Sequence, residues 1–217
     1  MRFVKNRIDD IIKKGLLTDK TVLEFGCVGM GIDDEYGGPN WIHGRAKKVA
    51  KKIVGLDLNK EGIEKLKKLG YDVRYQNVEN KFDLKEKFDV VLVEEVLEHL
   101  NNVGMCFENI IRHLKKEGLL IITTPNAHGA SFFLQRLFRN QISGVSITDH
   151  TLWYDETTLK TILKRYGFKI QKVWYVQPVS MNPTLKSYLI HIILSFLPSR
   201  AGRNLCCIAK KVNLNEK

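Results

Sequence analysis

The amino-acid sequence predicts an α/β protein with a mostly parallel sheet. Short apolar runs alternate with amphipathic helical patterns along the chain, which is typical of strand–helix–strand units joined by right-handed crossovers. Residues 88–93 form a continuous apolar run, as expected of a parallel strand that is buried on both faces. Neither an internal repeat nor a low-complexity segment divides the 217 residues, so we expect a single domain over 1–217.

The expected elements follow from the local pattern in chain order. Residues 4–15 have an apolar face and predict a helix that Gly15 ends. Gly70 and Gly167 end later helices in the same way, and Pro125 ends a strand. Strands are expected over 21–25, 53–57, 71–75, 88–93, 118–124, 168–175 and 205–211, and helices over 4–15, 45–51, 60–69, 102–114 and 155–166. The last two strands are expected to form a closing antiparallel pair.

Three segments exceed this minimal plan, namely 32–44, 127–149 and 178–203. We expect them to form a lid or to contribute to a substrate site. Within the last of them, residues 184–197 are apolar but shorter than the ~20 residues that span a bilayer. This stretch is therefore interpreted as a lid, a dimer contact, an interfacial helix or part of the core.

The stretch 21–31 and the strand that follows it indicate a ligand site. Glu24, Gly26 and Gly29 come where the first apolar strand ends, and glycine permits a positive φ and the close approach of a ligand. Asp57 ends the next strand, where a carboxylate is well placed to accept both hydroxyls of a ribose. The sequence therefore predicts a nucleoside ligand at this edge of the sheet.

Four motifs, in order and at suitable spacing, resemble those of class I S-adenosylmethionine (SAM)-dependent methyltransferases. They are Glu24–Phe–Gly26 with Asp57, the run 88–99, the strand end 121–126, and the segment 150–168. This resemblance covers about residues 20–175. It implies a Rossmann-like fold with a seven-stranded, mostly parallel sheet, helices on both faces and an antiparallel last strand. The loop departs from the usual acidic-x-Gly-x-Gly-x-Gly run, because Val28 and Met30 stand where glycines are expected.

The resemblance also implies which residues hold SAM and its product S-adenosylhomocysteine. Glu24 and Gly26 would border the amino-acid part of the cofactor, and Gly29 belongs to the same loop. Asp57 would bind the ribose hydroxyls, and Leu58 would pack on the adenine. The remaining candidates are Asn77 and Val78 at the adenine edge, with Glu79 as a further one, and Glu94 and Glu95 on the methionine side.

The implied activity is methyl transfer to an oxygen or nitrogen of a small, sugar- or lipid-linked metabolite. The cofactor carries the activated methyl group, so the protein must align the acceptor and exclude water. A hydroxyl acceptor also benefits from a general base, for which His99 and His150 are candidates and His43 is a further one. A non-catalytic SAM-binding module is an alternative, because Val28 replaces a glycine of the loop.

A second hypothesis for residues 95–99 is that they form a metal site. Glu95, Glu98 and His99 form an E-x-x-E-H run that could share a divalent cation. This run is similar to that of metal-dependent ubiquinone-pathway O-methyltransferases and of small-RNA 2′-O-methyltransferases, in which a later histidine completes the site, and Asp149–His150 could supply it. A metal-dependent RNA 2′-O-methyltransferase is therefore an alternative. In metal-free relatives the glutamate can instead cap a helix start.

Composition adds expectations about partners and location. The formal net charge is +11, which favours an anionic partner such as RNA or a membrane surface. The alternative interpretation is that the paired lysines on helix faces only keep the surface solvated. The four cysteines show no zinc-binding spacing, which suggests a reducing cytoplasm. The first residues lack the apolar core of a signal peptide. We therefore expect a cytoplasmic protein, with peripheral membrane association as an option.

Overall fold

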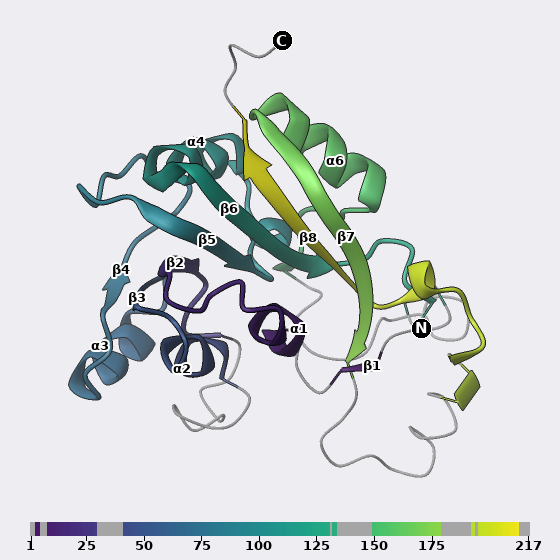
Figure 1. The fold of residues 1–217 in the computed structure, drawn as a ribbon, viewed down its shortest axis with the longest axis horizontal. Helices are drawn as coiled ribbons and strands as arrows, with labels where there is room; N and C mark the ends of the chain where they lie inside the picture. Colours follow the sequence, from purple (N-terminus) through teal and green to yellow (C-terminus); the bar gives the residue numbers. More distant parts are fainter. Residues whose placement is uncertain are drawn as a thin grey trace.

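The computed structural model describes residues 3–4, 8–29, 41–130, 132–133, 149–178, 192–193 and 195–212. Much of the three extra segments expected over 32–44, 127–149 and 178–203 lies outside these residues. The described part includes an eight-stranded central sheet and helices that pack on it (Figure 1).

The centre of the fold is one sheet with the strand order β1-β7-β8-β6-β5-β2-β3-β4. The strands are β1 Phe3–Val4, β2 Thr21–Phe25, β3 Lys52–Asp57, β4 Val73–Tyr75, β5 Phe88–Glu94, β6 Leu114–Pro125, β7 Phe168–Pro178 and β8 Asn204–Lys211. Only β8 runs antiparallel to its neighbours, which are β6 and β7. The seven expected strands are all present, and the mostly parallel sheet with an antiparallel last strand is confirmed.

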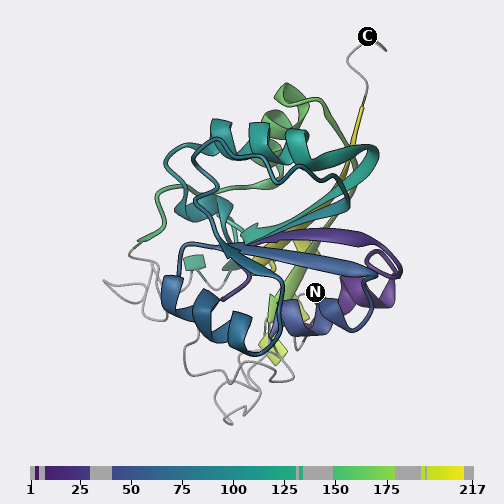
Figure 2. The same cartoon turned by 90° about the vertical axis from the view of Figure 1, so that its left-hand side faces the viewer.

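Helices cover both faces of the sheet (Figure 2). They are α1 Ile8–Lys13, α2 Ile42–Lys47, α3 Lys60–Lys68, α4 Val103–His113 and α6 Glu156–Arg165, with 3₁₀ turns η1 Leu97–His99 and η3 Ser199–Ala201. Phe107 of α4 and Leu159 of α6 lie in the core of one face. Ile11 of α1 and Ala46 of α2 lie in that of the other face. Burial of these apolar residues is the main stabilising term of such a layered fold.

Several element boundaries differ from the sequence-based expectation. The helix expected over 4–15 begins only at Ile8, because Phe3–Val4 instead form β1, which pairs with the edge of β7. The helix expected over 45–51 begins earlier, at Ile42. Strand β6 begins at Leu114 rather than at 118, directly after α4. The boundaries of β1 and β6 are set by pairing with strands that are distant in the sequence. Local periodicity does not indicate such pairing.

Two further expectations concern the environment of the protein. No helix among the described residues is long and apolar enough to cross a membrane. The side chains of all four cysteines are buried. Cys206 and Cys207 belong to different core clusters, on opposite faces of β8, as the alternation of side chains along a strand requires.

Candidate active site

The candidate site lies at the carboxyl ends of β2, β3, β5 and β6. Strand β2 pairs with β3 on one side and with β5 on the other. The chain therefore runs outward from β2 to β4 and then returns to the opposite side of β2. In open parallel sheets this reversal opens a crevice at the carboxyl ends of the strands, where ligands bind.

The loop after β2 has the backbone form that the glycines predict. Gly26 has a φ of +81°, and a Cβ added there would lie 2.6 Å from Val96 Cγ2. Gly29 has a φ of +73°, but a Cβ added there meets no described atom within 4 Å. Gly26 is thus required by packing as well as by conformation, whereas Gly29 is required by conformation and leaves its backbone open to a neighbour.

Val28 explains the departure from the glycine pattern. Its side chain is 2% exposed and packs in a cluster with Trp41 and Ile63. Its backbone N–H donates to Asp57 Oδ2 at 2.9 Å. A side chain is therefore accommodated here by turning into the core, while the backbone N–H still faces the strand ends.

Asp57 is held at the end of β3 by two backbone donors. Besides Val28, the N–H of Asn59 donates to Asp57 Oδ1 at 2.9 Å. A carboxylate offers about four lone-pair directions, so each oxygen keeps one for a further donor. Next to it, the Leu58 side chain is 52% exposed, and an exposed apolar side chain at a ligand-binding edge suits a planar apolar partner.

The predicted adenine-edge residues lie in the loop after β4. Asn77 Oδ1 accepts the Glu79 N–H at 2.8 Å, and the carbonyl of buried Val78 accepts from Asn109 Nδ2 at 2.9 Å. Glu79 Oε1 accepts the N–H groups of residues 101 and 102, both at 2.6 Å. Glu79 therefore ties this loop to the start of α4.

Glu24 does not lie open at the strand end. Its carboxylate is 1% exposed, and Glu24 Oε2 lies 2.7 Å from Nδ1 of His43, whose side chain is fully buried. His43, which the sequence offered as a further general base, therefore faces Glu24 inside the protein.

The acidic residues Glu94 and Glu95 lie at the end of β5. Glu95 has a φ of +51°, and its N–H donates to the Thr123 carbonyl. Asn204 of β8 donates from Nδ2 to both carboxylate oxygens of Glu95, at 3.1 and 3.0 Å. A non-glycine residue at positive φ is strained, and such strain gathers at functional sites.

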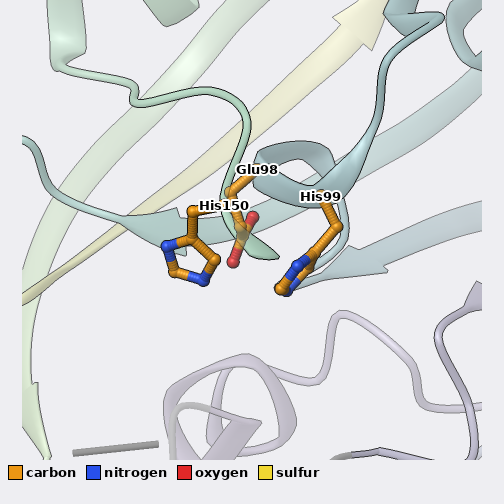
Figure 3. Close-up of side chains that lie close together, drawn as sticks. All are labelled: Glu98, His99 and His150. Carbon is orange, nitrogen blue, oxygen red and sulfur yellow. The ribbon is translucent and has the colours of Figure 1, made fainter. Parts of the chain in front are cut away.

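His99 and His150 meet beside Glu98, although they are 51 positions apart in the sequence (Figure 3). Their ring centroids are 4.7 Å apart, and His99 Nδ1 lies 3.3 Å from Asp149 Oδ2. The N–H groups of Thr151 and Leu152 donate to the Glu98 carbonyl, which brings the segment after His150 onto η1. Sequence reasoning proposed both histidines, and the structure brings them together.

The electrostatics of this cluster favour a neutral His150. Burial lowers the pKa of His150, and the neighbouring His99 lowers it further, while Asp149 and Glu95 oppose both effects. His150 Nδ1 is buried and has no hydrogen-bond partner among the described residues. A neutral imidazole with an unused nitrogen can accept a proton or a metal ion.

Comparisons with known proteins decide the family. Residues 2–173 match the family model described as "Methyltransferase domain". The chain belongs to this methyltransferase-domain family. A SAM-dependent methyltransferase from Archaeoglobus fulgidus has the same fold, with a TM-score of 0.64 at 18% identity over 94% of this chain and 91% of the other. Magnesium protoporphyrin IX methyltransferase from Synechocystis PCC 6803, with bound SAH, has a TM-score of 0.58 at 13% identity, covering 94% of this chain and 80% of the other.

Sequence relatives of this methyltransferase domain include ubiquinone biosynthesis O-methyltransferases. That of Bradyrhizobium diazoefficiens is 28% identical over 123 residues, which are 54% of this chain and 48% of the relative. The mitochondrial protein of Rattus norvegicus is 34% identical over 91 residues, which are 41% of this chain and 26% of the relative. The chain thus spans half or less of the length of these relatives.

The described residues of this methyltransferase domain fit SAM as its cofactor. Asp57 keeps free acceptor capacity for two ribose hydroxyls, Leu58 offers an exposed apolar surface, and no described atom lies within 4 Å of a Cβ built at Gly29. We therefore place the nucleoside at the ends of β2 and β3, as a proposal that rests on these three features.

The structure adds site residues that sequence reasoning missed. Asn204 reaches Glu95 from a position 109 residues away, and no local pattern marks such a partner. Trp153 lies against His150, with ring centroids 5.5 Å apart, and against Phe132 at 5.2 Å. Trp153 belongs to the motif segment 150–168 and lies three residues after His150. An aromatic residue so close to a candidate base could have indicated a further site residue.

Proposed function

We propose that this domain transfers a methyl group from SAM to a hydroxyl oxygen of a small metabolite. The observation that carries the proposal is the placement of the partly buried His150 imidazole beside His99 and Glu98, near the carboxyl ends of the strands. The names of the relatives, which are O-methyltransferases, support the acceptor atom. We further propose that this metabolite is linked to a sugar or a lipid.

In this mechanism the protein holds the cofactor at two places. Asp57 accepts the ribose hydroxyls with the lone pairs that Val28 and Asn59 leave free. Glu94 and Glu95 stand on the methionine side, where Asn204 fixes the Glu95 carboxylate. When bound, SAM supplies an electrophilic methyl group on a sulfonium. The contribution of these residues is to fix its direction toward the acceptor.

His150 acts as the general base. Because burial keeps its pKa below the ordinary histidine value, the ring is neutral near pH 7 and can accept the proton of the acceptor hydroxyl. Asp149 lies at hydrogen-bonding range of His99 Nδ1, which orients the second imidazole toward the same space. Trp153 packs beside His150 and provides an apolar surface next to the proton transfer.

The test begins with calorimetry of the wild-type protein with SAM and with S-adenosylhomocysteine. Labelled SAM and metabolite extracts then identify the acceptor. His150→Gln should keep SAM binding and lose about 100-fold in transfer rate. The matched control is His128→Gln, because His128 is 76% exposed and pairs with Asp155. Equal activity of His150→Gln and wild type would refute the role of His150, and SAM binding without transfer to any acceptor would favour a non-catalytic module.

A metal-assisted form of the same reaction is the second candidate. Glu98, His99 and His150 each offer a ligand atom, and these atoms lie within 4.8 Å of one another. One carboxylate and two imidazoles suit Zn²⁺ or Mn²⁺ better than Mg²⁺, which prefers oxygen ligands. Titration with Mn²⁺ and Zn²⁺ should give binding that Glu98→Gln abolishes. Activity that survives a chelator would exclude this form.

We also propose that the protein works in the cytoplasm and docks on an anionic membrane surface. The net charge is +11, and Phe133, Ile193 and Phe196 are 66%, 63% and 85% exposed. Apolar side chains together with positive charge are the combination that binds anionic lipid surfaces. Flotation with phosphatidylglycerol vesicles should carry the protein upward, and phosphatidylcholine vesicles should not. Protein that stays at the bottom with both vesicles, but binds RNA at low salt, would favour the RNA alternative.

A further inference from the structure

We propose that His43 is a positioning residue for the amino-acid end of SAM, acting through Glu24. The proposal rests on the proposed binding of SAM at the strand ends and adds a residue outside the motifs that suggested it. His43 belongs to α2, whereas Glu24 belongs to β2. Their side chains are 0% and 1% exposed and lie 2.7 Å apart.

The hydrogen bond fixes the orientation of both groups. Glu24 Oε2 and His43 Nδ1 share one hydrogen bond, so each buried side chain meets a polar atom of the other. A buried carboxylate without a partner would be costly. His43 therefore supplies what Glu24 requires in order to stay at this position, two residues before Gly26.

The surrounding residues are shaped for the imidazole. Gly55 of β3 stands opposite Glu24 in the sheet register. A Cβ at Gly55 would lie 2.9 Å from His43 Cε1 and 2.6 Å from Cys27 Sγ. The absence of a side chain at Gly55 therefore leaves the space that the ring of His43 occupies.

A second contact ties the same helix start to the cofactor loop. Trp41, which precedes α2, donates from Nε1 to the Cys27 carbonyl at 2.9 Å. The ring centroids of Trp41 and His43 are 5.3 Å apart, and Tyr71 packs on both rings, at 4.8 and 5.7 Å. The beginning of α2 thus contacts the Glu24 carboxylate of β2 and the backbone of the loop that follows β2.

The two ends of the cofactor are held by different groups, and this gives a specific test. Asp57 holds the ribose through contacts that do not involve His43. SAM and S-adenosylhomocysteine carry the amino-acid end, whereas 5′-methylthioadenosine has the same nucleoside without it. His43→Leu should therefore weaken binding of the first two by about tenfold and leave 5′-methylthioadenosine binding within about twofold of wild type.

Two polar variants separate positioning from folding. His43→Asn places an amide nitrogen near the position of Nδ1 and should retain most of the SAM affinity. His43→Gln places its amide near Nε2 and should lose affinity as His43→Leu does. This pair keeps the test usable if the leucine variant does not fold, which circular dichroism and urea unfolding would show.

The measurement is calorimetry with all three ligands on folded protein. Equal loss for all three ligands, or no loss for any of them, would overturn the role of His43. Equal affinities of the asparagine and glutamine variants for SAM would do so as well. A wild-type protein that binds none of the three ligands would instead overturn the proposed function on which this inference rests.

Discussion

Asp57 allows the sharpest test of the cofactor site. Its two carboxylate oxygens each accept one backbone N–H at 2.9 Å, from Val28 and Asn59, and we expect each to accept one ribose hydroxyl as well. Hydrogen bonds to a charged group contribute about 1.5–3 kcal/mol each. Asp57→Ala should therefore lower the free energy of unfolding by about 3 kcal/mol through the two lost backbone bonds. It should also weaken SAM binding by about 3 kcal/mol, which is a factor on the order of 100.

Calorimetry and urea unfolding measure these two effects separately. Asp57→Ala should weaken SAM, S-adenosylhomocysteine and 5′-methylthioadenosine to a similar degree, because all three contain the ribose. Asp72→Ala is a matched control, since Asp72 is 43% exposed and pairs with Arg74, and exposed ion pairs contribute little. An Asp57→Ala protein that binds 5′-methylthioadenosine as tightly as wild type does would show that the carboxylate does not hold the ribose.

Three further predictions concern stability and the acidic end of the site. Gly55→Ala should lower the free energy of unfolding in urea by about 1–3 kcal/mol, because its Cβ would lie 2.6 Å from a neighbouring side chain. A Cβ at Gly70 meets no described atom within 4 Å. Gly70→Ala should therefore lower the same free energy only by the strain of the positive φ, about 1 kcal/mol. Burial holds the pKa of His113 below its usual 6.5, so the unfolded chain binds more protons and the free energy of unfolding should fall as pH drops below about 6.5. His113→Gln cannot titrate, so its free energy of unfolding should differ less between pH 7.5 and 5.5 than that of wild type. An equal difference in the two proteins would contradict this role of His113. Asn204→Ala removes the donor to Glu95 and should raise the KM for SAM several-fold, whereas an unchanged KM would mean that Glu95 needs no help from β8.

The order of strands and helices could be predicted because periodicity is a local property. The buried run at 88–93 and the alternation around it were sufficient for the α/β class, and β5 spans Phe88–Glu94 in the structure. The N-terminal boundary could not be predicted in the same way. Phe3–Val4 form a strand because the edge of β7 is available to them, and an edge of a sheet exists only after the sheet has formed.

In the candidate site, too, some residues could be predicted from the sequence and some contacts could not. Gly26, Asp57 and the histidines were proposed from residue type and position, since glycine, carboxylate and imidazole have few uses at a strand end. The buried bond between Glu24 and His43 was not foreseen, because a side chain bonded to a residue 19 positions away leaves no periodic signal. The same holds for Asn204, whose amide reaches Glu95 across the sheet.

The sequence by itself determined the class of fold, the family motifs and the edge of the sheet at which the ligand is expected, because these follow from apolar periodicity and from the chemistry of single residues. Only the tertiary structure decided which side chains meet: that Val28 turns inward while its N–H reaches Asp57, that His43 faces Glu24, and that His99 and His150 share one site. These contacts join residues that are distant along the chain, and the packing of helices on the sheet brings them together.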